Sequence, residues 1–562
     1  MAGPLHFRAP LRAASLSSAP SQTVSMHGDA PAIELVQPAA RAQRTRIAVR
    51  GALGAQRLRT GAARRVGAGS LAAVVVLSLF IVLIAANRPS LLAPTSHSGF
   101  YPHWMSGPLG GLLPGFTDNS TALRFMFTGA IVLMFIGYVL VLGRAGSLPA
   151  RWVIGAILAV HLIFLLSPPL ALTDMFNYIN YGRMEVVHNL NPYTTIPVLE
   201  PHSDPAYLLS NWHELLSPYG PLFTLLTFVV VPLGVAGSFW GLKAILMVAS
   251  LGTILLVWKS AAMLGREPRL AVALVGLNPI VLVWGLGAGH NDFLMLGCIM
   301  LGFYLLLRSH AFGRPHEPGE PGGIRELGRT ARKLGRTARA LGRPPSLSAW
   351  LSPLSATQIG AGAAFVLAAG IKASGAVLIP VVLAGLVRAP RALLQVLMGM
   401  ALGLAFVAAA SLLAFGLHVP DLSTQGSLVT SESVPNLIGL AIGAGGESDA
   451  LRKVMIAALI VSVGACCRLA WRRRDPITAS GWASVALLLT LSWVLPWYVL
   501  WALPLAALSR SRRLRVATLV LGAYLILVWA PVSGLLWHAI GFHPERTSLG
   551  RLHQRYVKEL LN

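Results

Sequence analysis

Long apolar stretches separated by short basic segments constrain the fold of this chain more than any other feature. The stretch Leu123–Leu142, for example, has the length of about 20 residues that a helix needs to cross a lipid bilayer. Because backbone groups in lipid must be satisfied internally, uninterrupted apolar runs favour helices over a barrel. The chain is also 55% hydrophobic and only 12% charged, whereas soluble proteins carry about 25% charged residues. The sequence therefore predicts an all-α polytopic membrane protein.

The formal net charge of +25 reflects this organisation. Most Lys and Arg residues lie in short loops and tails between apolar stretches, as is typical of the cytoplasmic segments of membrane proteins. The charge therefore indicates topology, and we expect membrane lipids as neighbours and no nucleic acid. The cysteines, Cys298, Cys466 and Cys467, fall within predicted spans and form neither a disulfide framework nor a zinc-binding spacing.

The distribution of basic loops predicts about thirteen transmembrane helices in a multi-pass protein of the plasma membrane. One apolar segment, Pro221–Leu233, does not fit this alternation, because a span there would put the very basic segment 308–343 outside the cell. The segment is short and begins with proline. We therefore expect it to form an external juxtamembrane or re-entrant helix, and we expect the polar segment before it to lie on the extracytoplasmic face.

Changes in composition divide the chain into five predicted parts. The basic loop contains two copies of LGRTAR, at 327–332 and 334–339, whose apolar residues follow helical spacing. Such a helix either lies on an anionic inner membrane surface or serves only as a charged topology determinant. The five parts are a disordered basic cytoplasmic tail (1–66), an N-terminal membrane module (67–307) with a catalytic external loop (167–221), a basic cytoplasmic loop with an amphipathic helix (308–356), a C-terminal membrane module (357–534) and a C-terminal tail (535–562).

Polar and ionisable residues gather in three segments that this topology places outside. Ionisable residues at membrane depth cost roughly 2.5–3.5 kcal/mol each, so they are candidates for function. We expect the three segments to form one outward-facing site. They contain Asp174, the sequence His290-Asn291-Asp292, and Lys372, which we expect near Trp497 and Tyr498.

Asp174 has two interpretations. A carboxylate at the membrane boundary can act as a general base that takes a proton from an attacking hydroxyl. Asp is also a favoured N-cap, here for a helix over 175–188. Because Phe176 and not a second acid stands two positions later, a divalent metal is possible but not implied, and no cofactor is firmly implied.

The remaining candidates would bind the parts of a phosphorylated sugar. Lys372, flanked by Gly and Ala, and Arg183, with its planar fork, are candidates for a donor phosphate, although Lys372 could instead extend to the membrane interface. His290, Asn291 and Asp292 either bind sugar hydroxyls or cap the next helix. Tyr219 lies first of all in a turn. The candidates for sugar or acceptor binding are Tyr178, Tyr181, Glu185, His290, Asn291, Asp292 and Tyr219.

Several motifs between about residues 170 and 390 resemble one known family. They are TDMFNYINYGRM, NLNPY, SPYGPLF, NPIVLVWGLGAGHNDFLM and GIKASG. In their order and spacing they are similar to the polyprenol-phosphate-mannose-dependent α-(1→6)-mannopyranosyltransferases of actinobacteria, membrane glycosyltransferases of the GT-C class.

This resemblance implies a GT-C-type fold with the active site on the extracytoplasmic face. It implies a polyprenyl-phosphate mannose donor and a lipid-linked glycan acceptor, such as a growing mannan or glycolipid. Asp174 matches the acidic residue of the first large external loop, which is the catalytic base proposed for the family. The family's Asp-aromatic pairing is present only loosely, as Asp174-Met175-Phe176.

Two function classes follow from these observations. The first is a glycosyltransferase that acts with inversion and needs one base and a cationic group for the leaving phosphate. The second is a transporter or flippase of a lipid-linked sugar, in which the same polar residues line a path. Transporters often contain internal repeats, and the halves of this chain show none. The gathering of polar residues on one side favours the enzyme.

Overall fold

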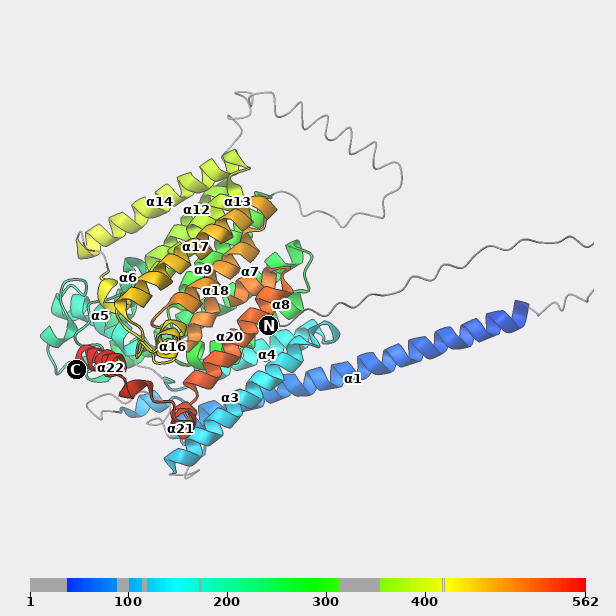
Figure 1. Ribbon diagram of the computed structural model, residues 1–562, viewed down its shortest axis with the longest axis horizontal. Helices are drawn as coiled ribbons and strands as arrows, with labels where there is room; N and C mark the ends of the chain where they lie inside the picture. The colour runs from blue at the N-terminus through cyan, green and yellow to red at the C-terminus, as the bar shows by residue number, and fades with distance from the viewer. Residues whose placement is uncertain are drawn as a thin grey trace, which may run out of the picture. The chain divides into compact units, whose positions relative to one another are not determined.

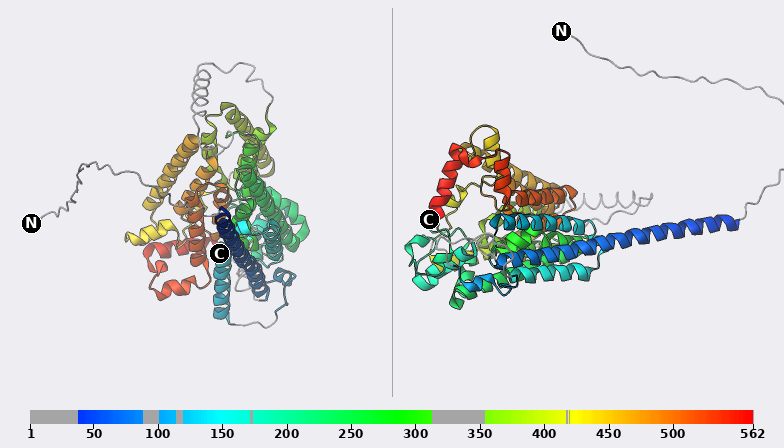
Figure 2. Two further views of the ribbon diagram at one scale, coloured as in Figure 1. Left: turned by 90° about the vertical axis from the view of Figure 1, so that its right-hand side faces the viewer. Right: turned by 90° about the horizontal axis from the view of Figure 1, so that it is seen from below.

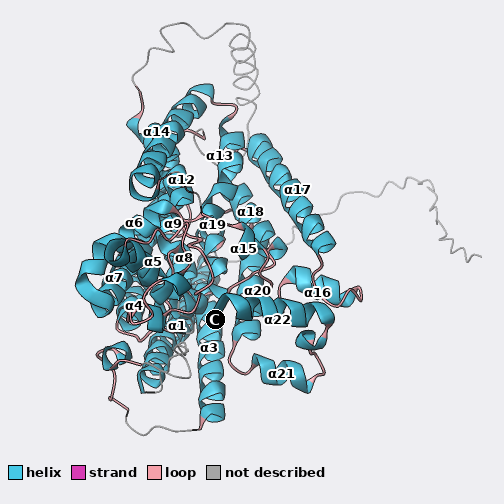
Figure 3. Ribbon diagram, turned by 90° about the vertical axis from the view of Figure 1, so that its left-hand side faces the viewer, coloured by secondary structure: helices cyan, strands magenta, loops and turns pink. Residues whose placement is uncertain are grey.

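The computed structural model describes residues 38–87, 101–113, 119–170, 174–312, 354–416, 418 and 420–561, with side chains from Gly61 onward. These residues form helices and no strand, which confirms the predicted all-α class (Figure 3). Residues 1–37 of the predicted disordered tail, and the amphipathic helix predicted within 308–356, lie outside the described residues, whereas residues 38–66 of that tail are helical. The chain divides into two compact units, Met1–Thr60 and Gly61–Asn562, and the second contains every feature discussed below.

The described residues form nineteen α-helices and several shorter helical turns, and most of the α-helices are labelled in Figure 1. The α-helices are α1 (Pro38–Asn87), α3 (Ser120–Leu142), α4 (Ala150–Leu165), α5 (Asp174–His188), α6 (Pro221–Val230), α7 (Gly234–Met263), α8 (Pro268–Gly276), α9 (Asp292–Arg308), α12 (Ala356–Ile371), α13 (Ile379–Leu386), α14 (Pro390–Phe415), α15 (Ser423–Gly426), α16 (Val434–Ala441), α17 (Asp449–Arg473), α18 (Pro476–Thr490), α19 (Leu503–Leu508), α20 (Arg512–Trp529), α21 (Ser533–Ala539) and α22 (Ser548–Leu561). The shorter or irregular turns are η1 (His103–Ser106), η2 (Ala145–Ser147), η3 (Pro197–Leu199), η4 (Tyr207–Leu209), η5 (Val231–Leu233), η6 (Val281–Gly287), η7 (Ala373–Leu378), η8 (Pro496–Trp501) and η9 (Pro544–Arg546).

Five of the described helical segments are long and apolar enough to cross a bilayer, and seven if each of two bent pairs is one span. The bent pairs are α8 with η6, at 57°, and α20 with α21, at 82°. Other apolar helices have only 10–17 residues, so the predicted count of thirteen spans stays a prediction. The five segments are Gly61–Asn87, Ser120–Leu142, Pro221–Met263, Pro390–Phe415 and Asp449–Arg473.

The chain changes direction between α6 and α7, although the two helices are contiguous in sequence. Ser238 donates a hydrogen bond to the carbonyl of Val230 at 2.8 Å, whereas residues eight apart in one continuous helix are separated by about 12 Å along its axis. Gly234, with a φ of 71°, provides the break. The structure therefore separates Pro221–Leu233 from the following span, as expected, while its place on the outer membrane surface stays a prediction.

Helix α12 packs between α9 and α14, and α9 packs in turn against α7. Glycines permit this close approach, because a Cβ on Gly362 would overlap the Val396 carbonyl and one on Gly399 would overlap the Ile359 carbonyl. In a bilayer, such close van der Waals packing at small residues stabilises the bundle, because lipid tails are as apolar as the buried side chains. The packing fixes the C-terminal end of α12, where Lys372 follows Ile371.

The predicted C-terminal tail, 535–562, contains most of α21 and all of η9 and α22. Helix α22 lies at the same end of the second unit as α5 (Figures 1 and 2). The amide of Glu214 donates to the carbonyl of Leu560 at 3.3 Å, and the hydroxyls of Ser427 and Tyr556 lie 3.0 Å apart. Two separate loops therefore hold α22 in place.

Candidate active site

A cavity lies at the end of the helix bundle where α5 and α22 are found. Its volume is about 1620 Å³, including the space at its open mouth. Asp174, His290 and Lys372, one from each of the three predicted polar segments, all line it. The structure thus brings the three segments to one place, although they are far apart in the sequence.

Helix α5 turns one polar face toward the cavity. Asp174, Tyr178 and Tyr181 line the cavity and stand at positions i, i+4 and i+7, which share one face of a helix. Helix α6 supports the helix from behind, since a Cβ on Gly182 would overlap the Thr227 hydroxyl. Asp174 is also the first residue of α5, so it lies at the start of the helix and lines the cavity at the same time.

His290 follows an irregular helical segment, η6, which has the wider π-type turn that is frequent at functional sites. Gly289 takes a φ of 75°, and a Cβ there would overlap Met175 Cε. Its conformation turns the buried His290 ring toward α5. Nδ1 of His290 lies 3.4 Å from Asp174 Oδ2 and 3.4 Å from the Tyr178 hydroxyl. The imidazole stacks on Trp497 with 3.5 Å between ring centroids.

Lys372 forms an ion pair with Asp292. Its Nζ lies 3.0 and 2.8 Å from the two carboxylate oxygens, and Trp501 Nε1 also donates to this carboxylate. The Asp292 side chain is fully buried, while that of Lys372 is 17% exposed and reaches the cavity. The ammonium also lies over the rings of Tyr498 and Trp501, at 4.9 and 5.6 Å from their centroids. Asp292 is therefore the counterion of Lys372.

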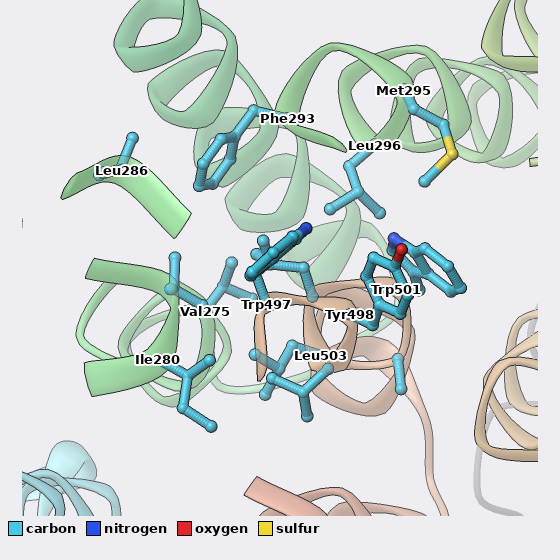
Figure 4. Close-up of a cluster of buried hydrophobic side chains, with 14 of the residues drawn as sticks. Val275, Ile280, Leu286, Phe293, Met295, Leu296, Trp497, Tyr498, Trp501 and Leu503 are labelled. Atoms are coloured by element: carbon cyan, nitrogen blue, oxygen red, sulfur yellow. The ribbon is translucent and has the colours of Figure 1, made fainter. Parts of the chain in front are cut away.

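The aromatic residues around Lys372 come from η8. Figure 4 shows Trp497, Tyr498 and Trp501 of this turn facing the side chains of α9. Tyr498 lies next to Lys372, as predicted, and Trp497 lines the same cavity. Trp501 was not predicted, although its place in the aromatic run WVLPWYVLW is a signal that could have identified it.

Tyr219 reaches the cavity through a close contact between two backbones. The amide of Gly220 donates to the carbonyl of Ile371 at 3.1 Å, and a Cβ on Gly220 would overlap the Gly370 carbonyl. The turn predicted at Tyr219 therefore joins the segment that carries Lys372. The Tyr219 ring packs edge-on against Tyr178, with 4.7 Å between centroids.

Asp174 differs electrostatically from an ordinary surface acid. Burial raises the pKa of its carboxyl from 3.8 to about 6, even though the positive charge of Lys372 lowers it. The negative charge of Asp292 raises this pKa further. Helix α5 is not one of the apolar spans. With a pKa of about 6, the Asp174 carboxyl is ionised at neutral pH and is more basic than a free carboxylate, which suits a general base.

Four predicted residues lie outside the cavity lining, and one of them is Asp292, the buried counterion of Lys372. Arg183 is bound to Asp204, donating from Nε at 2.9 and 3.1 Å and from Nη2 at 2.7 Å, and His188 lies 2.9 Å from the same carboxylate. The guanidinium group of Arg183 is thus already paired with a carboxylate of the protein. Glu185 and the buried Asn291 do not line the cavity either.

Several cavity residues were not predicted at all. Neither Asn211 Oδ1 nor Trp497 Nε1 has a hydrogen-bond partner among the described residues, and both are buried. Such polar atoms lose free energy unless a ligand or water satisfies them. The unpredicted residues that line the cavity include Asn211, Trp212, Trp493, Trp501, Trp529, Val557 and Leu561.

A divalent metal would need a group of ligating side chains. Among the described residues, one group of three could hold an ion, namely His538, His543 and Glu545 near α21. It lies outside the cavity lining.

Comparison with known proteins gives two family matches. Residues 67–388 match the model of the α-(1→6)-mannopyranosyltransferase N-terminal domain, and residues 430–541 match that of the MptB C-terminal domain. The chain is 28% identical over 381 residues to α-(1→6)-mannopyranosyltransferase A of Mycobacterium tuberculosis, covering 65% of this chain and 67% of the relative.

Two further relatives carry the same activity in their names. A second α-(1→6)-mannopyranosyltransferase of Mycobacterium tuberculosis is 26% identical over 403 residues, which is 66% of this chain and 67% of that protein. α-(1→6)-Mannopyranosyltransferase A of Corynebacterium glutamicum is 25% identical over 154 residues, 27% of this chain and 31% of the relative. No solved structure matches the chain.

Proposed function

Because the chain belongs to the α-(1→6)-mannopyranosyltransferase family, we propose that it transfers a mannosyl residue from a polyprenyl-phosphate donor to a lipid-anchored mannan or glycolipid. The reaction would take place on the extracytoplasmic face, where the distribution of basic loops predicts that the cavity lies. The observation that carries this proposal is the pairing of groups in the cavity. One carboxylate with a raised pKa faces the same space as one ammonium.

Asp174 is the general base of the proposed reaction. Its carboxylate accepts the proton of an acceptor hydroxyl while that oxygen attacks the anomeric carbon of the mannosyl donor. The bond from this carbon to the phosphate oxygen breaks, and its electron pair leaves with the polyprenyl phosphate. Attack opposite the leaving group inverts the anomeric configuration, so an α product requires a donor of the opposite configuration.

Lys372 would bind the phosphate. An ammonium has three donors, and two short contacts join this one to Asp292 while its exposed part faces the cavity. The charge would stabilise the negative charge that develops on the leaving phosphate. Asp292 and Trp501 fix the position of the ammonium, so little reorganisation is needed during the reaction.

His290 would act as a positioning residue for Asp174. Its Nδ1 lies between the Asp174 carboxylate and the Tyr178 hydroxyl, and Trp497 holds the ring from one face. A donor on Nδ1 would orient one carboxylate oxygen and leave the other toward the cavity. Tyr178, Tyr181 and Tyr219 would then supply hydroxyls and ring faces for the sugar.

A test must separate transfer from transport, because the same polar cavity could serve a lipid-linked sugar transporter. Purified protein in lipid vesicles would receive polyprenyl-phosphate mannose labelled in the sugar, together with an oligomannoside acceptor. The proposal predicts label in an α-(1→6)-linked product. Movement of intact labelled donor across the vesicle membrane, without product, would overturn it in favour of the transporter. Transfer from a sugar nucleotide alone would overturn the proposed donor.

A further inference from the structure

A second cavity adjoins the candidate active site. Its volume is about 1110 Å³, including open space, and it lies between α22, the segment 429–436 and η9. The two cavities share part of their lining, which makes them neighbours. The shared residues are Trp493, Trp529, Val557 and Leu561.

One complete face of α22 lines this second cavity. Its lining residues recur at the i, i+3, i+4 and i+7 spacing of a helix face. The face is polar in its middle, at His553, Gln554 and Lys558, and it becomes apolar where it reaches the candidate active site. The lining residues of α22 are Gly550, His553, Gln554, Val557, Lys558 and Leu561.

Tryptophans connect the two cavities. Trp212 lines the candidate active site and packs edge-on against Trp493, with 6.2 Å between ring centroids. Trp493 and Trp529 are only half-buried and line both spaces. Aromatic rings provide large, rigid contact area at a low cost in conformational entropy, and side chains such as Glu432 and Gln554 supply hydrogen-bonding groups beside them.

We propose that the second cavity is an acceptor subsite, which binds the sugar units of an oligomannoside beyond the unit that receives the new residue. This inference rests on the proposed mannosyl transfer. The mixture of tryptophan faces, an acid, an amide and an amine suits a chain of hydroxyl-bearing rings. A polyprenyl chain requires an apolar channel instead, and the polar middle of the α22 face does not provide one.

If the second cavity is an acceptor subsite, KM should depend on the length of the acceptor, and substitutions in this cavity should reduce that dependence. KM would be measured for a dimannoside and for a longer α-(1→6)-linked oligomannoside, with polyprenyl-phosphate mannose as donor. Wild type is expected to have the lower KM for the longer acceptor. Glu432→Gln and Gln554→Ala should each raise the KM of the longer acceptor by about fivefold to tenfold, the ratio that one lost hydrogen bond produces.

The matched control is Arg555→Ala, which follows Gln554 on α22 and is exposed like it, but which lies outside both linings. This variant should keep the wild-type ratio of the two KM values. An equal rise of KM for both acceptors in the Gln554 variant would overturn the subsite. A rise in donor KM alone would also overturn it and would assign the cavity to the donor lipid.

Direct binding separates this inference from the proposed function. The longer oligomannoside would be titrated into the protein without donor, and tryptophan fluorescence would report binding. Saturable binding that Gln554→Ala weakens, in a protein that transfers no mannose, would overturn the proposed function and leave the subsite standing. Transfer by a protein whose affinity is the same for both acceptor lengths would overturn the subsite alone.

Discussion

Asp174 and Asp292 are two carboxylates of one site that differ in exposure and in how closely they are paired. Asp292 is fully buried and saturated, since it accepts from Lys372 and from Trp501. Asp174 is 16% exposed at its side chain, faces the cavity, and has one longer contact of 3.4 Å with His290.

The difference shows how one site can keep two acids for separate tasks. A carboxylate that is buried and fully paired holds a cation in place. A carboxylate that is desolvated but loosely paired has a raised pKa and can accept a proton. On this account, Asp292 positions Lys372 and Asp174 performs the chemistry, and four substitutions test the division.

The largest effect is expected from Asp174→Asn. The amide has nearly the shape of the acid but cannot accept the proton, so transfer should slow by about 10²–10⁴-fold, the range of a lost general base. Labelled donor and acceptor in vesicles measure the rate. Glu185→Gln, on the same helix but outside the cavity, is the matched control and should keep wild-type activity. A normal rate for the Asn variant would show that Asp174 is not the base.

Lys372→Met should reduce both transfer and stability. Removing the ammonium leaves Asp292 as an unpaired buried charge, which typically costs about 3–5 kcal/mol. Thermal unfolding in detergent measures the stability. The double variant Lys372→Met/Asp292→Asn should regain stability, because neither charge remains, but should still transfer slowly for want of a cation beside the phosphate. A double variant as unstable as the single one would contradict the pairing.

Asp292→Asn should shift the pH dependence of transfer. The charge of Asp292 raises the pKa of Asp174 and that of Lys372 lowers it. Removal of the Asp292 charge therefore lowers this pKa, and the acid limb of kcat/KM should move to lower pH. The Glu185→Gln profile serves as the reference. An acid limb that stays in place or moves upward would mean that the two carboxylates do not interact.

Gly220→Ala should have the smallest effect of the four, about a tenfold loss of transfer. The Cβ of the alanine would overlap the Gly370 carbonyl, so the turn carrying Tyr219 must move away from the Lys372 segment. A displacement of about 1 Å can slow a reaction by about 10²-fold, and we expect a smaller one here. Gly234→Ala, at the break after α6, has open space around its Cβ but a positive φ. It is expected to affect stability more than the KM of the donor.

Much of the fold followed from the sequence because apolar runs report helices directly. The predicted stretch 123–142 coincides with Ser120–Leu142, although the described helix is three residues longer at its start. The number of crossings did not follow as firmly, because helices of 10–17 residues are too short to decide by length.

The site was predictable where a polar residue interrupts an apolar segment, as Asp174, His290 and Lys372 do. The ion-pair partners of the charged residues were not predictable. Nothing in the local sequence shows that Asp292 pairs with Lys372, 80 positions later, or that Arg183 pairs with Asp204 instead of facing the cavity. The role of α22 was missed because a polar amphipathic stretch near the C-terminus resembles a solvated tail until its packing partners are known.

The most direct test of Asp174 as the base is the single-turnover transfer rate as a function of pH, in wild type and in Asp174→Asn. Because burial raises the pKa of Asp174 to about 6, the wild-type rate should fall below that pH, approaching a tenfold loss per unit. The slow residual rate of the Asn variant should lose this dependence. An Asn variant that keeps the same acid limb would contradict the account, because the titrating group would then be another residue.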